Sequence, residues 1–119
     1  MFREALKQVV DGTEGGIAAI LMGYDGIPLE QYIVDEAELN VETVGMEFSV
    51  VLSQIRKAAE MLEAGTAREV TIHAEQMTTV IRLLNDEYFV AVALRPTGNS
   101  GKARFLLRTG AAKLVEALT

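Results

Sequence analysis

The side chains most able to do chemistry are one histidine, His73, and seven arginines, in a chain of 119 residues that has no cysteine. A histidine can act as a general base or hold zinc, but both roles need partners that the sequence does not announce. His73 lies where polar and apolar residues alternate, which favours a surface or interface position over a ligand. The lack of cysteine excludes disulfides, thiolate nucleophiles and cysteine-based zinc sites.

Residues 98–102 (GNSGK) come nearest to a phosphate-binding loop. A Walker A loop needs glycine where Pro96 stands and serine or threonine where Ala103 stands, so the match fails at two positions. We interpret the segment as a helix cap in which Asn99 or Ser100 supplies the oxygen.

An acidic connection contains Asp35, Glu36, Glu38 and Glu42. It lacks the glycine and the spacing of a calcium loop, so a solvated connection is favoured over a metal site. The net charge of −6 argues against nucleic-acid binding, which needs clustered Lys and Arg. We therefore expect no cofactor, no metal and no nucleic acid, and favour a protein partner.

The length suits a single domain over residues 1–119. No apolar window is long enough for a membrane span, and the N-terminus (MFREALKQVV) is charged and lacks the apolar core of a signal peptide. We expect a soluble, cytoplasmic protein without membrane insertion.

Glycines and one proline divide the first third of the chain. Residues 2–12 place apolar side chains at helical spacing, and the apolar run 17–22 predicts a strand buried on both faces. Asp25-Gly26 within GYDGIPLEQY favours a tight hairpin. Pro28 then predicts that the second strand lies at a sheet edge, because proline has no N–H to donate.

A long helix is predicted from about Val41 to Ala64. A second apolar stripe, Met46, Val50 and Met61, lies opposite the predicted core face, and a helix that covers one sheet does not need it. Gly45, Ser49 and Ser53 form a ridge of small residues that another backbone could approach. The predicted core face consists of Val41, Val44, Phe48, Val51, Leu52, Ile55, Ala59 and Leu62.

Three strands, at 68–74, 77–84 and 88–94, and a helix from about Lys102 to Leu118 complete the chain. The doubly apolar first and fifth strands belong in the middle of the sheet, which gives the order 2-1-5-4-3. We predict an α+β fold, an α/β/α sandwich with a five-stranded, mainly antiparallel sheet. The long helix covers one face, and the N- and C-terminal helices cover the other.

The third strand has no proline or lysine to block its open edge, and it occurs together with the doubly apolar helix. Both features predict a symmetric homodimer in which third strands pair and long helices pack together. The predicted dimer interface is Met46, Ser49, Val50, Ser53, Lys57, Met61, Val70, Ile72 and His73.

The whole chain resembles the roadblock family, which is named for dynein light chains and includes the bacterial MglB proteins. The resemblance is carried by Gly15-Gly16 before the first strand, the Asp25-Gly26 hairpin, the helix from Val41, the meander, and the leucine-rich helix after Gly98-Asn99. It implies the profilin-like roadblock fold and a homodimer that binds small Ras-like GTPases across the paired long helices.

The leading hypothesis is therefore a non-catalytic, MglB-like regulator or scaffold of a Ras-like GTPase. Its role as an activating protein or only an adaptor stays open. An arginine finger is one possible device, but ordinary surface ion pairs are favoured for Arg56 and Arg68. The alternative is a small-molecule sensor that binds a ligand on the sheet. The predicted partner-binding residues are Thr43, Gln54, Arg56 and Arg68.

Overall fold

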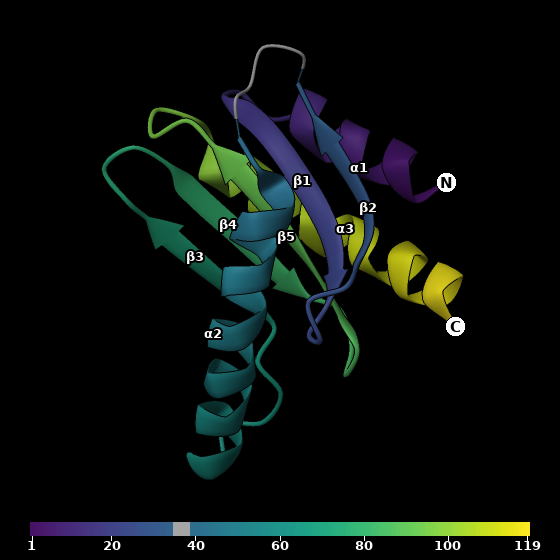
Figure 1. Ribbon diagram of the computed structural model, residues 1–119, viewed down its shortest axis with the longest axis vertical. Coiled ribbons are helices and arrows are strands. Elements are labelled where there is room, and N and C mark those ends of the chain that lie inside the picture. Colours follow the sequence, from purple (N-terminus) through teal and green to yellow (C-terminus); the bar gives the residue numbers. More distant parts are fainter. Residues whose placement is uncertain (35–38) are drawn as a thin grey trace.

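Five strands form one antiparallel sheet in the computed structural model, which describes residues 1–34 and 39–119 (Figure 1). The strand order is β2-β1-β5-β4-β3, which confirms the predicted order. The elements are α1 (Phe2–Asp11), β1 (Gly16–Gly23), β2 (Pro28–Ile33), α2 (Val41–Met61), β3 (Glu69–His73), β4 (Thr78–Leu83), β5 (Tyr88–Leu94) and α3 (Ser100–Leu118).

The turn between β1 and β2 is the hairpin that its sequence predicts. Gly26 has φ +86°, a conformation that side chains disfavour, and the Asp25 carboxylate accepts a hydrogen bond from the Ile27 N–H at 3.0 Å. The Gly23 N–H donates to the Ile27 carbonyl at 3.0 Å and closes the turn. This segment therefore folds the chain back so that β2 forms one edge of the sheet.

The sheet separates two apolar layers. On one face, Leu6 of α1 and Leu107 of α3 pack on Leu21 and Val90. On the other face, α2 covers a second cluster that includes Met22. Because β1 and β5 contribute to both layers, their side chains are buried on both faces, as their unbroken apolar sequences predict.

Asparagine side chains cap the two longer helices. The Asn40 side-chain oxygen accepts from the Thr43 N–H at 3.1 Å, and the Asn99 oxygen accepts from the Lys102 N–H at 3.0 Å. The cap interpretation of residues 98–102 is therefore confirmed, with Asn99 as the capping residue.

Two residues of the predicted core face are exposed: Val51 by 44 % and Leu62 by 78 %. The last turns of α2 extend past the end of the sheet, so no strand lies beneath Leu62 (Figure 1). Val51 lies on the side of the helix rather than beneath it. The prediction for these two residues was wrong, because helical spacing defines a stripe but not how much of it the sheet covers.

Candidate functional site

The long helix α2 exposes apolar side chains along much of its length. Met46 is 55 % exposed, Val50 61 % and Met61 84 %, as the second stripe predicts. Val51 and Leu62 are exposed as well, but on a different side of the helix. Since an α-helix advances about 100° per residue, they lie roughly 100° around the axis from Val50 and Met61.

The first of these sides faces the β1–β2 turn. A methyl group on Gly26 would lie 3.9 Å from Met46 Cγ, and Ile27 beside it is exposed. We call this surface the hairpin flank. The residues that α2 contributes to it fall within an arc of about 80° on an ideal helix. The hairpin flank consists of Ile27 and of Thr43, Met46, Val50, Gln54, Lys57 and Met61 on α2.

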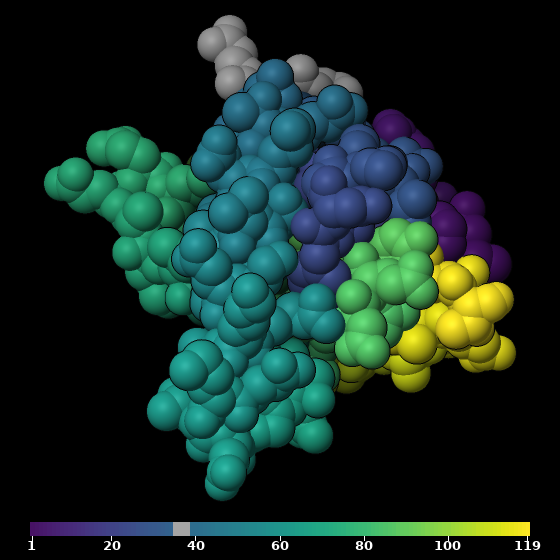
Figure 2. Space-filling view, turned by 60° about the horizontal axis from the view of Figure 1, so that its bottom comes forward, coloured from purple at the N-terminus to yellow at the C-terminus, as the bar shows by residue number. Residues whose placement is uncertain are grey.

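The second side of α2 faces the opposite edge of the sheet. Phe48 and Ile55 of α2 pack in the same cluster as Val70 of β3. Val51 and Leu62 lie next to them around the helix, and we call these two residues the edge flank. In Figure 2, α2 stands out as a ridge with the β1–β2 turn on one side and the β3–β4 hairpin on the other.

The ridge of small residues on α2 contacts the chain itself. A methyl group on Gly45 would lie 2.8 Å from the end of the Met22 side chain, so α2 packs closely on β1 there. Ser49 is only 4 % exposed, and its hydroxyl donates to the Met46 carbonyl at 2.6 Å. Ser53 is half-buried and donates to the Ser49 carbonyl at 3.1 Å. Ser49 therefore has almost no surface to offer a partner.

The outer edge of β3 is open in the described part of the chain, where β3 pairs only with β4. The Leu83 N–H donates to the Arg68 carbonyl, and the Ala74 N–H donates to the Met77 carbonyl. Because antiparallel pairing alternates along a strand, the backbone N–H and C=O groups of residues 69, 71 and 73 point away from β4. This edge is able to accept another strand.

His73 lies at the end of this edge and is exposed. Its Nδ1 is 3.4 Å from the hydroxyl of Thr78 on the paired strand. In residues 1–34 and 39–119, no three His, Asp or Glu side chains come together in a way that would hold a metal ion. Asp35, Glu36 and Glu38 of the acidic connection lie outside the described residues.

Arg56 and Arg68, the two arginines of the predicted partner-binding set, lie near the end of the sheet at the β4–β5 turn rather than on either flank of α2. The Arg56 guanidinium lies over the Tyr24 ring, 4.2 Å from its centroid, and its Nη2 is 3.3 Å from the Asp86 carboxylate. Burial raises the pKa of Tyr24 to about 12, while Arg56 lowers it and Asp86 raises it further. Arg68 is exposed and lines a small pocket together with Arg56. Sequence reasoning did not find this pocket, because its residues come together only in the folded chain.

A groove of about 800 Å³ lies between α1 and α3, on the face of the sheet opposite α2. Its walls include Ala5, Val9, Leu107 and Leu114, and its rim carries Glu4 and Lys113. The volume is that of a small-molecule pocket, but the polar groups do not converge on one point of the kind that fixes a ligand. None of the described helices is both long and apolar enough to cross a membrane.

Comparisons with known proteins agree with this architecture. The chain is 40 % identical to MglC from Myxococcus xanthus, with a TM-score of 0.71 and 98 % of each chain covered. The chain belongs to the roadblock family. A Roadblock/LC7 domain from Streptomyces avermitilis shares 14 % identity over 94 % of this chain and 96 % of its own, with a TM-score of 0.76. No protein-family profile and no curated protein sequence matches.

MglB structures share the same roadblock fold. MglB from Thermus thermophilus has a TM-score of 0.84 at 16 % identity, over 95 % of this chain and 84 % of its own. An MglB in a tetrameric arrangement gives the same values. The predicted fold is thus confirmed, and membership of the roadblock family supports a regulatory or scaffolding role for this chain.

Proposed function

We propose that this roadblock protein is a homodimeric regulator or scaffold that binds a small Ras-like GTPase. The observation that carries the proposal is that α2 exposes apolar side chains on two separate flanks beside an open strand edge. Exposed apolar patches on soluble proteins mark interaction sites. Two patches on different sides of one helix provide for two different neighbours.

The edge flank and β3 form the proposed dimer surface. Two copies of β3 pair antiparallel around a two-fold axis through their outward backbone groups, which gives one continuous ten-stranded sheet from two sheets of five strands. Val70 and Ile72 lie on the α2 face of β3, so they approach the partner's α2 in this arrangement. Val51 and Leu62 then pack across the axis. The MglB tetramer shows that another roadblock-fold protein associates, which supports assembly here.

In this arrangement, the residues of the dimer interface expected from sequence belong to two separate surfaces. Val70, Ile72 and His73 stay at the dimer axis, whereas Ser49 is left out because it is buried. The hairpin flank instead contains Met46, Val50, Lys57 and Met61, together with Thr43 and Gln54 of the predicted partner-binding set. Ser53, half-buried, lies at the margin of that flank.

The hairpin flank is the proposed docking surface for the GTPase. Met46 and Met61 have flexible, polarisable side chains that adapt to a partner's surface. Binding regulates the GTPase only when the affinity differs between its GTP-bound and GDP-bound conformations. Arg56 is held by Tyr24 and Asp86, so the proposal gives it no role as an arginine finger.

A pull-down with a purified Ras-like GTPase from the same genome tests the proposal. We expect the GTP-loaded and GDP-loaded forms to be retained unequally, and Met46→Glu to abolish retention because it places a charge in the apolar patch. Phe105→Glu on α3, another exposed apolar side chain, is the matched control and should bind as the native chain does. Equal retention of the two forms, or no retention of either form, would contradict the regulatory mechanism.

A further inference from the structure

A small pocket of about 210 Å³ lies at the end of the sheet, beside the β4–β5 turn. The side chains that could contact a ligand there include Tyr24, Arg56, Arg68 and Asn85. Arg82 also lines the pocket, but its guanidinium lies on the α3 face of β4, near Glu69 and Arg104. The pocket thus has two arginine side chains within reach, Arg56 and Arg68, and no carboxylate among its lining residues, in a chain whose net charge is −6. Positive charge concentrated in an acidic protein indicates an anionic ligand.

The carboxylates near the pocket do not neutralise these arginines completely. Arg56 uses two of its five N–H donors on Asp86, one at the carboxylate and one at the backbone carbonyl. Arg68 makes no ion pair with the described residues. Arg68 and the remaining N–H donors of Arg56 are therefore available to a ligand.

One buried polar atom of the lining residues also lacks a partner. The Tyr24 hydroxyl is shielded from solvent and makes no hydrogen bond within the described part of the chain. A buried donor without an acceptor costs folding free energy, so such atoms are uncommon unless a ligand or water completes them. Since the pKa of Tyr24 is about 12, its hydroxyl remains a donor at neutral pH.

We propose that this pocket binds a single oxyanion group, the phosphate or carboxylate end of a ligand, between Arg68, Arg56 and the Tyr24 hydroxyl. Guanidinium groups bind both kinds of oxyanion through parallel N–H bonds, and a phenol adds a third donor. The pocket is smaller than the roughly 300 Å³ at which small-molecule sites begin, so it holds one group rather than a whole cofactor. The site does not depend on a GTPase partner.

Titration of the purified chain with inorganic phosphate and, separately, with acetate tests this site. Chloride keeps the ionic strength constant, and the backbone amide NMR signals of Thr66, Ala67 and Asn85 report binding. We expect saturable shifts, weakened about tenfold by Arg68→Gln and by Tyr24→Phe. Stronger binding of phosphate identifies a phosphoryl group as the ligand, and equal or stronger binding of acetate identifies a carboxylate.

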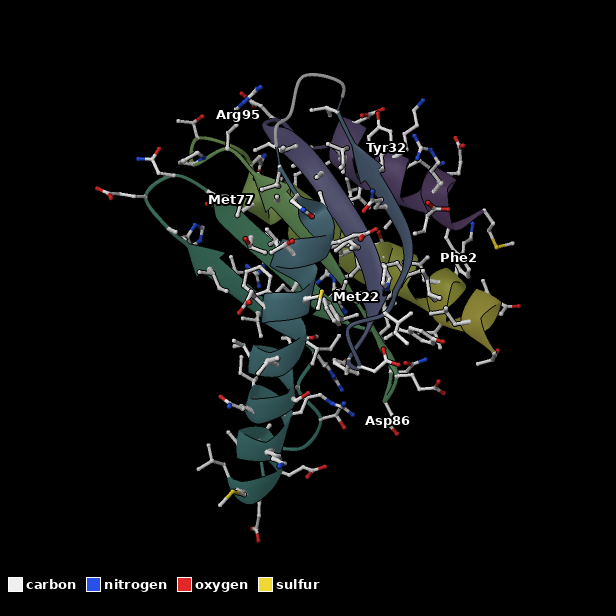
Figure 3. The ribbon with its side chains drawn as sticks, viewed as in Figure 1. Phe2, Met22, Tyr32, Met77, Asp86 and Arg95 are labelled. Carbon is white, nitrogen blue, oxygen red and sulfur yellow. The ribbon has the colours of Figure 1, made fainter. Side chains whose placement is uncertain are left out.

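Arg95→Gln is the matched control, because it removes the same charge at the other end of the sheet, far from Asp86 (Figure 3). It should leave the affinity unchanged. A second variant, Arg68→Lys, keeps the charge but loses the planar fork, so it should bind with intermediate affinity. Shifts that do not saturate with either anion, or equal weakening by Arg68→Gln and Arg95→Gln, would overturn the proposal.

Discussion

The guanidinium of Arg56 lies 4.2 Å from the centroid of the Tyr24 ring, and this contact joins the C-terminal half of α2 to the residue that follows β1. Tyr24 in turn packs against the buried ring of Phe89, with 5.5 Å between the ring centroids. The salt bridge from Arg56 to Asp86 adds the β4–β5 turn to the same group. One arginine therefore connects three segments that lie far apart in the sequence.

Replacing Arg56 should test how much this connection stabilises the fold. We expect Arg56→Gln to lower the free energy of unfolding by about 1 kcal/mol, mainly through loss of the cation–π contact. Asp86 is almost fully exposed, so Asp86→Asn should change it by less than about 0.5 kcal/mol. Urea denaturation measures the free energy of unfolding of both variants. Equal losses would show that the ion pair contributes more than the cation–π contact.

The raised pKa of Tyr24 predicts a loss of stability at alkaline pH. Its pKa is about 12 in the folded chain against 10.0 for an ordinary tyrosine. The stability that depends on un-ionised Tyr24 is fully present below pH 10.0. It is lost as the pH rises towards 12, because this tyrosine ionises at a lower pH in the unfolded chain than in the folded one. Denaturation at a series of pH values should show this decline. In Tyr24→Phe the decline should be smaller, and an unchanged decline would contradict the assignment.

Two glycines should respond oppositely to alanine. A Cβ on Gly16 would lie 2.3 Å from the Val10 carbonyl oxygen, a backbone atom that cannot move aside, so Gly16→Ala should destabilise the chain by about 1–3 kcal/mol. Gly110 lies inside α3, and apart from its chain neighbours and the helix's own backbone no atom would lie within 4 Å of such a Cβ. Gly110→Ala should therefore stabilise the chain by about 0.5–1 kcal/mol. Thermal unfolding of both variants checks the signs.

A proline in β3 should separate folding from dimer formation. The N–H of Thr71 points away from β4, so Thr71→Pro leaves the internal ladder intact but removes a donor at the proposed dimer axis. We expect dimer affinity in sedimentation experiments to fall about tenfold or more. Val70→Pro removes a ladder N–H instead and should prevent folding. A Thr71→Pro chain that folds and still dimerises normally would exclude pairing through β3.

Neighbouring valines on α2 distinguish the two flanks. Val51→Glu places like charges together at the proposed two-fold axis and should shift the protein to monomer in sedimentation experiments. Val50→Glu changes the hairpin flank, so it should leave the dimer intact and weaken GTPase binding. The opposite result, in which only Val50→Glu gives a monomer, would show that the dimer forms through the second apolar stripe, as expected from sequence.

Most of the fold follows from local signals in the sequence. Gly26 and Pro28 specify the hairpin and the edge position of β2, and the apolar runs of β1 and β5 specify the centre of the sheet. The exposure of Val51 could not be predicted in this way, because it depends on where α2 crosses the sheet. The contact between Arg56 and Tyr24 joins residues 32 positions apart and has no sequence signal of its own.

The overhang of α2 beyond the sheet makes the end of this helix a natural reporter of association. Beyond Arg56 the helix extends past the sheet, Glu60 and Met61 are exposed, and helix ends with little tertiary support fray. In dilute solution, the amide protons near Met61 should exchange quickly with deuterium. Once a neighbouring molecule covers Leu62 the same protons become protected, so the order of this segment depends on protein concentration.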